Sequence, residues 1–215
     1  MLNQISLLDL VDSFNGRPIP PYVLAATLAT ELTSTKQTAK QLSLCSKNAQ
    51  AITARADEWG KGFSGITDYI NDTANIMIEL ADKVGKLAQG LTKASVKSVF
   101  EQKMAANLEK LSAQAFQAHP ELHGLTQEIL KSADSFNNKN VEAVIELKKN
   151  LREIKDCNRT LNSIVAICRI EASRAGPFQD SLWAIADTIE GAVLTLKDRM
   201  LMGDRLMNLM EMQTC

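Results

Sequence analysis

Two stretches, NAQAITARADEWGKGFSGITDYI (residues 48–70) and RIEASRAGPFQDSLWAIADTI (residues 169–189), decide the fold of this 215-residue chain. Each interrupts a long helical pattern with a short segment that contains glycine. Gly60, Gly62 and Gly176 are the predicted turn residues, because glycine accepts a positive φ angle at little cost. We therefore expect each stretch to join two helices.

The composition favours helices and a non-membrane protein. Hydrophobic residues make up 45%, charged residues 23% and aromatic residues 5% of the chain, and the formal net charge is -1. Straight side chains such as Leu, Lys, Glu, Gln and Met keep most of their rotamer freedom in a helix. The near-zero charge argues against general nucleic-acid binding. No apolar run is long enough for a transmembrane helix, and the four cysteines form no CxxC pair, so we expect a cytoplasmic protein.

Apolar residues recur with heptad spacing on both sides of the first turn and before the second. The segment after the first turn and the segment before the second each carry two such tracks, which favours coiled-coil packing. After the first turn, one predicted track is Phe63, Ile70, Met77, Val84 and Leu91, and the other contains Ile66, Thr73, Leu80, Leu87 and Ala94. Before the second turn, the tracks are Leu147, Ile154, Leu161, Cys168 and Ala175, and Val144, Leu151, Asn158, Val165 and Ala172.

The first half of the chain matches the second half after a shift of 119 positions. Leu28 then falls on Leu147 and Phe63 on Leu182, and the phases agree on both sides of the turns. We predict an all-α fold, an elongated antiparallel four-helix coiled-coil bundle made of two duplicated helical hairpins. Its expected parts are an N-terminal segment with a short helix (1–21), the first hairpin (22–117), a connector (118–124) and the second hairpin (125–215).

The residues around the first turn resemble the hairpin tip of bacterial methyl-accepting chemotaxis receptors. The family pattern Asn-Ala-Ala-(Ile/Val)-Glu-Ala-Ala-Arg-Ala-Gly-Glu-x-Gly-(Arg/Lys)-Gly-Phe is matched at Asn48, Arg55, Glu58, Gly60 and Phe63, among other positions. The second copy matches at Glu171, Arg174, Gly176 and Ile185. The resemblance covers roughly 20 to 25 residues at each turn. Ile52 replaces the family Glu in the first copy, and Pro177 to Leu182 replace the family turn in the second.

The resemblance implies a function in protein–protein interaction. Receptor tips dimerise into four-helix bundles and bind a histidine kinase and its coupling adaptor. A chain with two such hairpins would present a receptor-dimer-like tip to the chemotaxis kinase, the adaptor or chemoreceptors, as a soluble signalling or scaffold protein. The expected partner-binding residues are Asn48, Arg55, Glu58, Trp59, Phe63, Ile66, Glu171, Arg174, Phe178, Leu182 and Ile185. Further self-association stays open.

Two alternatives come from other classes of function. One is a structural or regulatory interaction bundle with a partner outside chemotaxis. The other is a cytoplasmic sensor of a small ligand, which a polar pocket near Asn158 would favour. The sequence offers no phosphate-binding glycine loop and no nucleophile beside a base, so we predict no enzymatic activity, no cofactor and no metal.

Overall fold

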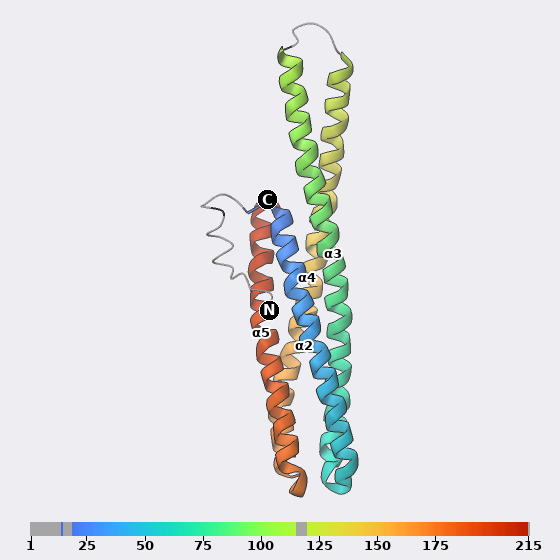
Figure 1. Cartoon of the computed structure of the whole chain (residues 1–215), viewed down its shortest axis with the longest axis vertical. Coiled ribbons are helices and arrows are strands. Elements are labelled where there is room, and N and C mark those ends of the chain that lie inside the picture. Colours follow the sequence, from blue (N-terminus) through green and yellow to red (C-terminus); the bar gives the residue numbers. More distant parts are fainter. Residues whose placement is uncertain (1–13, 15–18, 115–119, 215) are drawn as a thin grey trace. The chain divides into compact units, whose positions relative to one another are not determined.

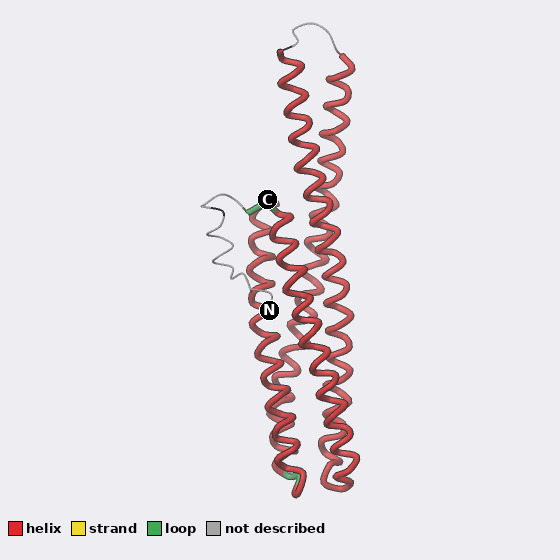
Figure 2. Tube along the Cα trace, viewed as in Figure 1, coloured by secondary structure: helices red, strands yellow, loops and turns green. Residues whose placement is uncertain are grey.

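The computed structural model describes residue 14 and residues 19–114 and 120–214, and every element in these residues is helical. Figures 1 and 2 show long α-helices joined by short turns, with no strand in the described ranges. The elements are α2 (Pro21–Ala56), η1 (Asp57–Gly60), α3 (Lys61–Gln114), α4 (Pro120–Ser173), η2 (Gly176–Phe178) and α5 (Gln179–Thr214). The predicted all-α class is therefore confirmed.

The helix boundaries follow the breaks in the sequence, with one difference. We placed residues 118–124 in a connector, but α4 already begins at Pro120. Proline fits the first turn of a helix, because its missing N–H has no partner there and its φ is preset for a helix. The predicted short helix in residues 1–21 falls largely outside the described residues.

The chain divides into two compact units, which cut across the four long helices. The first, here called the tip unit, consists of Leu28–Gly85 and Lys148–Arg205 and contains both turns. The second, here called the terminal unit, consists of Met1–Thr27, Lys86–Leu147 and Leu206–Cys215.

In the tip unit, polar contacts join α2 to α3 in antiparallel order. Lys36 Nζ lies 2.5 Å from Asp82 Oδ1, and Ser43 Oγ donates a hydrogen bond to Asn71 Oδ1 at 2.8 Å. Closer to the turn, the Ser46 hydroxyl donates to the Thr67 carbonyl. The residue numbers of the partners increase along α2 as they decrease along α3, so the two helices run antiparallel.

Contacts also join the first hairpin to the second within the tip unit. Cys45 Sγ of α2 lies 3.9 Å from the Ile185 carbonyl oxygen of α5. Further along, a β-carbon on Gly203 would lie 3.8 Å from Leu28 and 3.5 Å from Leu151, in ordinary van der Waals contact. Segments of α2, α4 and α5 therefore share one apolar interior in this unit.

The duplicated heptads are buried at matched positions. Six pairs of residues that are 119 positions apart are each at most 2% exposed, so both members lie in the core. They are Leu28 and Leu147, Leu42 and Leu161, Ala56 and Ala175, Phe63 and Leu182, Ile70 and Ile189, and Met77 and Leu196. Both tracks predicted before the second turn are buried as well.

The second predicted track of α3 is wrong in phase. Of its members, Thr73 is buried but Ile66, Leu80, Leu87 and Ala94 are only half-buried, whereas the small residues one position further along the chain are all buried. The buried track is Thr67, Ala74, Ala81, Ala88 and Ser95. A helix whose facing side chains are this small can approach its neighbours closely, and close packing then fills the core without large side chains.

A buried ion pair crosses between the hairpins. Arg199 Nη1 of α5 donates to Glu31 Oε2 of α2 at 2.7 Å, and their side chains are 18% and 11% exposed. Arg199 thus lies beside the core because Glu31 compensates its charge there.

The terminal unit buries large apolar side chains such as Leu24, Leu147 and Leu206, but between residues 95 and 133 its buried residues are small or polar. Ala105, Ala133, Ser98 and Thr126 are buried there. The Ser132 hydroxyl lies 3.3 Å from Glu101 Oε1, which also faces Lys97 Nζ at 3.7 Å. Large apolar side chains are exposed on the same stretches of α3 and α4, including Phe100, Met104, Leu111 and Ile145.

Candidate functional site: the paired turns

The two turns lie against each other at one end of the tip unit. Gly176 of η2 faces the Trp59 ring of η1, and a β-carbon on Gly176 would be 3.1 Å from that ring. At the start of α3, a β-carbon on Gly62 would overlap the carboxylate of Glu171, which belongs to α4. The two sequence stretches that break the helical pattern therefore form one composite surface.

The three turn glycines serve two different purposes. Gly176 has a φ of +52°, as predicted for a turn glycine. Gly60 and Gly62 lack positive φ, so our expectation for them was wrong. Gly60 is needed for space, because a β-carbon there would lie 2.5 Å from the Thr53 carbonyl oxygen and 2.8 Å from Thr53 Cα. The first turn is thus a compact 3-10 turn that packs on the backbone of α2.

The end of α4 closes differently from the end of α2. Arg174 N donates to the Glu171 carbonyl and Ala175 N to the Ala172 carbonyl, both at 3.1 Å. Phe178 N then donates to the Ala175 carbonyl at 3.0 Å, which forms η2. These short-range bonds satisfy carbonyls that the helix end leaves without partners.

The predicted partner-binding residues fall into three groups by burial. The exposed group contains most of the charged side chains and one large aromatic ring: Asn48, Arg55, Glu58, Trp59 and Arg174. The half-buried group is Ile66, Glu171 and Phe178, and the buried group is Phe63, Leu182 and Ile185. Phe63 and Leu182 are 1% and 0% exposed, so they are core residues in this structure.

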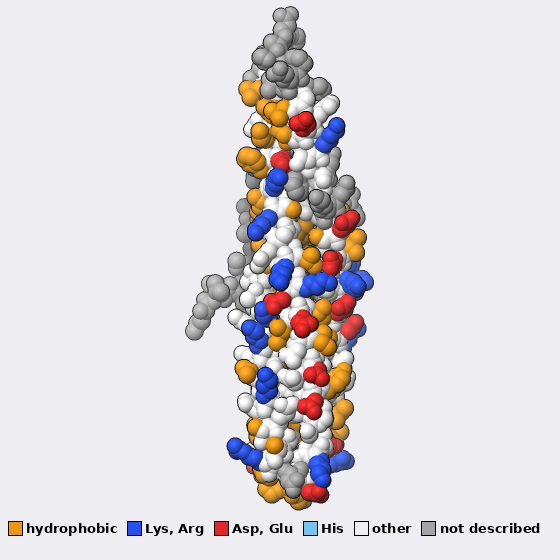
Figure 3. Space-filling view, turned by 90° about the vertical axis from the view of Figure 1, so that its right-hand side faces the viewer, with side chains coloured by type: hydrophobic (Ala, Val, Ile, Leu, Met, Phe, Trp, Pro, Cys, Tyr) orange, Lys and Arg blue, Asp and Glu red, His pale blue; other side chains and the backbone are white. Residues whose placement is uncertain are grey.

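Trp59 is the most prominent apolar group at the turns. It is 58% exposed although one part of its ring packs on Gly176. Figure 3 shows hydrophobic side chains at this end of the tip unit with charged side chains around them. An exposed ring held in place on one side loses little conformational entropy on binding, which suits an anchor residue.

The charges at the turns are paired only loosely. Lys61 Nζ lies 2.5 Å from Glu58 Oε1, yet both side chains are at least 70% exposed. Arg174 Nη1 lies 3.3 Å from Glu171 Oε1. The Glu58–Lys61 pair is exposed and contributes little to stability, and Arg174, whose side chain is 71% exposed, also remains accessible to a partner.

Two polar pairs occupy equivalent places beside the turns. Gln50 Nε2 donates to Asp68 Oδ1 at 2.6 Å, and Arg169 Nη2 donates to Asp187 Oδ1 at 2.9 Å. Gln50 and Arg169 are 119 positions apart, and so are Asp68 and Asp187. The two hairpins therefore match in their side-chain contacts as well as in which residues are buried.

In the second hairpin, Arg169 forms further contacts that Gln50 does not form in the first. Arg169 also donates to the Glu190 carboxylate, and its guanidinium lies 5.7 Å from the centre of the Trp183 ring. A cation at this distance from an indole face is attracted by the ring. Sequence reasoning missed Arg169 and Trp183, although the identical residues Asp68 and Asp187 at matched positions were a signal for the pair that Arg169 forms.

Cys45, Cys157 and Cys168 are free thiols. Burial raises the pKa of Cys45 and of Cys157, and for Cys157 the neighbouring Asp156 raises it further. Burial raises the pKa of Cys168 to about 11. All three thiols are therefore protonated at neutral pH, the form that is least reactive.

Within the described ranges, no three residues among His, Cys, Asp and Glu are grouped so that they could hold a metal ion. None of the described helices combines the length and apolarity needed to cross a membrane.

Comparisons with known proteins give no identification: no protein-family model, curated protein or solved structure matches the chain. The resemblance to receptor tips therefore rests on the residues of the two turns.

Proposed function

We propose that the chain is a chemoreceptor-like signalling or scaffold protein of the cytoplasm that acts through protein contacts and without catalysis. Its hairpins form an antiparallel four-helix coiled-coil bundle that imitates one receptor dimer. The paired turns are presented to a chemotaxis histidine kinase, its coupling adaptor or chemoreceptors.

The juxtaposition of the two turns carries this proposal. A receptor dimer brings two hairpin tips together, and here Trp59 of one turn packs against Gly176 of the other. Support also comes from the matched pairs Gln50–Asp68 and Arg169–Asp187, since duplicated hairpins related by a pseudo-twofold axis repeat such contacts. The exposed Arg55 and Arg174 stand at matched places for a partner.

The proposal is tested by capture with the chemotaxis kinase, the adaptor and the receptors of the same organism. The wild-type chain is compared with an Arg55→Ala/Arg174→Ala variant. A matched control is Arg152→Ala/Arg205→Ala, which removes the same charge from exposed positions of α4 and α5 away from the turns. We expect the wild type and the control to capture a partner, and the tip variant to lose it.

Two results would contradict the proposal. Equal loss in both double variants would indicate non-specific attraction between charges. Absence of capture of all three partners by the wild-type chain would favour an interaction bundle with a partner outside chemotaxis.

A further inference from the structure

One face of α3 in the terminal unit carries a stripe of exposed apolar side chains. The stripe consists of Val96, Phe100, Met104 and Leu111, which are 49%, 66%, 41% and 58% exposed. Half-buried Leu108 lies between the last two, so the members follow one another at intervals of about one helical turn. The stripe is about 22 Å long at 1.5 Å per residue. A contiguous apolar row of this kind on a surface indicates an interaction site.

The stripe lies on the side of α3 that faces away from α4. Ser98 and Ala105 mark the buried side of α3, and between them Glu101 Oε1 lies 3.3 Å from the Ser132 hydroxyl of α4. Successive residues of an α-helix are about 100° apart, so Phe100 is about 200° around the helix from Ser98. The second helix of the hairpin therefore leaves the stripe uncovered.

Lysines border the stripe along its whole length. Lys97 and Lys103 each lie three residues from Phe100, and Lys93 lies seven residues before it, which places all three near the same face. Lys110 stands at the other end of the stripe. Lys93, Lys103 and Lys110 are exposed, and the Lys97 side chain is 57% exposed. The apolar side chains are thus surrounded by positive charge.

The acidic residues of this part of α3 lie on the opposite side. Glu101 and Glu109 are each four residues from the buried Ala105, so both belong to the side that faces α4. Residues 86–114 contain five lysines and two glutamates, a net charge of +3, whereas residues 120–147 of α4 have a net charge of -3. The hairpin therefore has a positive α3 side and a negative α4 side.

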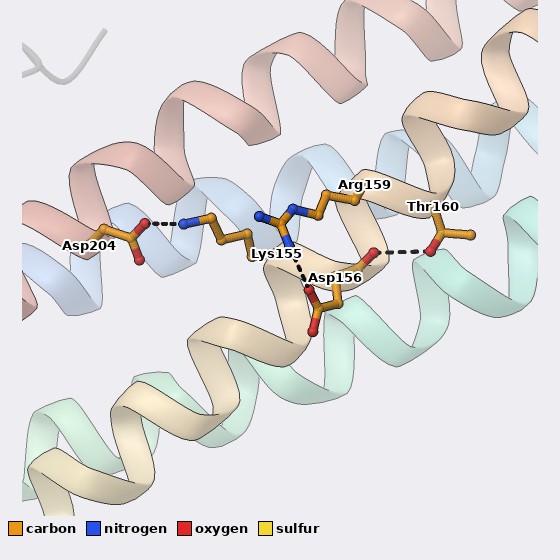
Figure 4. Close-up of polar contacts among 5 residues, drawn as sticks. All are labelled: Lys155, Asp156, Arg159, Thr160 and Asp204. Carbon is orange, nitrogen blue, oxygen red and sulfur yellow. Dashed lines mark hydrogen bonds and ion pairs between the residues drawn. The ribbon is translucent and has the colours of Figure 1, made fainter.

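Charges are distributed differently in the tip unit. Figure 4 shows Lys155 of α4 reaching across to Asp204 of α5, while Arg159 faces Asp156 one turn earlier in α4. There, cations and acids alternate and neutralise each other locally. On the stripe side of α3 the lysines have no such excess of acids beside them, so the positive potential around the apolar row persists.

An anionic lipid bilayer matches both properties of this surface. Helices that lie in a membrane interface combine an apolar face with Lys or Arg beside it, because the apolar side chains enter the acyl boundary while the cations stay at the headgroups. Negatively charged lipids attract each such cation. A flat bilayer can also reach a stripe that lies on the outer side of a hairpin.

A second copy of the chain fits the stripe less well. Two α3 stripes packed on each other would bring lysines against lysines. Contact of the stripe with α4 of another copy would place apolar side chains against a surface that carries the exposed Glu128 and Glu142. Such a contact is also heterologous, so it would propagate into open assemblies.

We propose that this face of α3 docks on an anionic lipid bilayer. Phe100, Met104 and Leu111 enter the boundary between headgroups and acyl chains, and the lysines lie at the level of the lipid phosphates. The helix lies in the plane of the surface and does not cross it. The proposal is independent of the paired turns, because it uses residues of the terminal unit alone.

Co-sedimentation of the full chain with lipid vesicles tests the proposal. The vesicles contain phosphatidylcholine alone or with about 30% phosphatidylglycerol, in about 0.1 M salt so that attraction to the surface is only partly screened. We expect the chain to sediment with the anionic vesicles and to stay in solution with the neutral ones.

Charge variants locate the electrostatic part of the binding. Lys93→Gln/Lys103→Gln/Lys110→Gln should weaken binding to the anionic vesicles about 100-fold, at about fivefold for each lysine. The matched control removes three exposed lysines of the tip unit, Lys40→Gln/Lys149→Gln/Lys197→Gln. It changes the net charge equally and should bind within about twofold of the wild type, because those positions are screened from the surface.

Apolar variants locate the inserted side chains. Phe100→Gln/Leu111→Gln should weaken binding at least about tenfold, since two large side chains no longer leave water. The control Leu125→Gln/Ile145→Gln removes side chains of α4 that are 43% and 65% exposed, and it should keep wild-type binding. Every substituted side chain is exposed, so all variants should keep the helical circular dichroism of the wild type.

Three results would overturn the proposal. The first is a wild-type chain that stays in solution with both kinds of vesicle, and the second is equal weakening in the stripe variants and their controls. The third is an oligomer, seen by light scattering without lipid, that Phe100→Gln/Leu111→Gln dissociates, because a second copy would then occupy the stripe. Capture of chemotaxis proteins by the paired turns depends on the tip unit, so the two proposals fail separately.

Discussion

The indole ring of Trp59 lies against the backbone of Gly176, which has a φ of +52° and no side chain to hold the ring away. Gly176 is doubly constrained, since a β-carbon there would be 3.1 Å from the ring and the left-handed backbone disfavours other residues. The pair joins the turn of the first hairpin to the turn of the second.

Alanine substitutions of the three turn glycines should therefore lower the free energy of unfolding by different amounts. Gly60→Ala forces a β-carbon against the Thr53 backbone and should reduce the free energy of unfolding by about 2 to 3 kcal/mol. Gly176→Ala should cost about 1 to 2 kcal/mol. Gly62→Ala should cost less than either, because the atoms it meets belong to the flexible Glu171 side chain.

Gly65→Ala is the control for this series. Gly65 lies inside α3, and a β-carbon there would meet no neighbouring atom within 4 Å, so alanine should stabilise the chain by about 0.5 to 1 kcal/mol. Urea unfolding midpoints give the order. Equal effects at Gly60 and Gly65 would contradict the packing of the first turn on Thr53.

Substitutions of Glu31 and Arg199 should have non-additive effects on the free energy of unfolding. Arg199→Leu leaves a buried carboxylate without its partner and should cost about 3 kcal/mol. Glu31→Leu/Arg199→Leu removes both charges and should return to within about 1 kcal/mol of the wild type. Chemical unfolding of the single and double variants gives the coupling energy.

The exposed Glu58–Lys61 pair serves as the comparison. Glu58→Ala should change the free energy of unfolding by no more than about 0.5 kcal/mol. A larger loss there than for Arg199→Leu would be incompatible with the burial of the two pairs.

The buried track of small residues in α3 predicts that a larger side chain destabilises the protein there but not on the exposed face of the same helix. Ala74→Leu inserts three carbons into the core of the tip unit and should cost about 1 to 3 kcal/mol. Ala106→Leu makes the same change at an exposed position of the same helix and should stay within about 0.5 kcal/mol of the wild type. Urea unfolding compares the two variants. Comparable losses at both positions would refute the assigned buried face of α3.

The Cys168 thiol predicts a fall in stability at alkaline pH. Its folded pKa of about 11 lies above the ordinary value of 9.0, so the unfolded chain loses this proton first as the pH rises. Stability from the protonated thiol is complete below pH 9.0 and is lost as the pH rises towards about 11. Unfolding curves of the wild type and of Cys168→Ala should converge over this range.

The rate of alkylation gives a second test of the burial of the Cys168 thiol. Iodoacetamide should modify Cys168 slowly in the folded chain at pH 8 and rapidly in urea, because only unfolding exposes a thiolate. Rapid modification in the folded state would contradict its burial.

Periodicity predicted the helices and most of the core, since heptads of Leu, Ile and Met dominate α4 and the first track of α3. It failed for the second track of α3, because the buried alanines carry a weaker hydrophobic signal than Ile66 or Leu80. The turn glycines were located correctly, yet only the structure separates the positive φ of Gly176 from the tight packing at Gly60.

Contacts such as Glu31 with Arg199 and Cys45 with Ile185 join hairpins that belong to one covalent chain. Two separate receptor-like hairpins would part on dilution, whereas hairpins in one chain meet at an effective concentration set by the chain itself. Their pairing is then a first-order process that does not depend on how many copies a cell contains. A molecule built this way keeps both turns together at very low abundance, and the number of paired turns scales linearly with its expression.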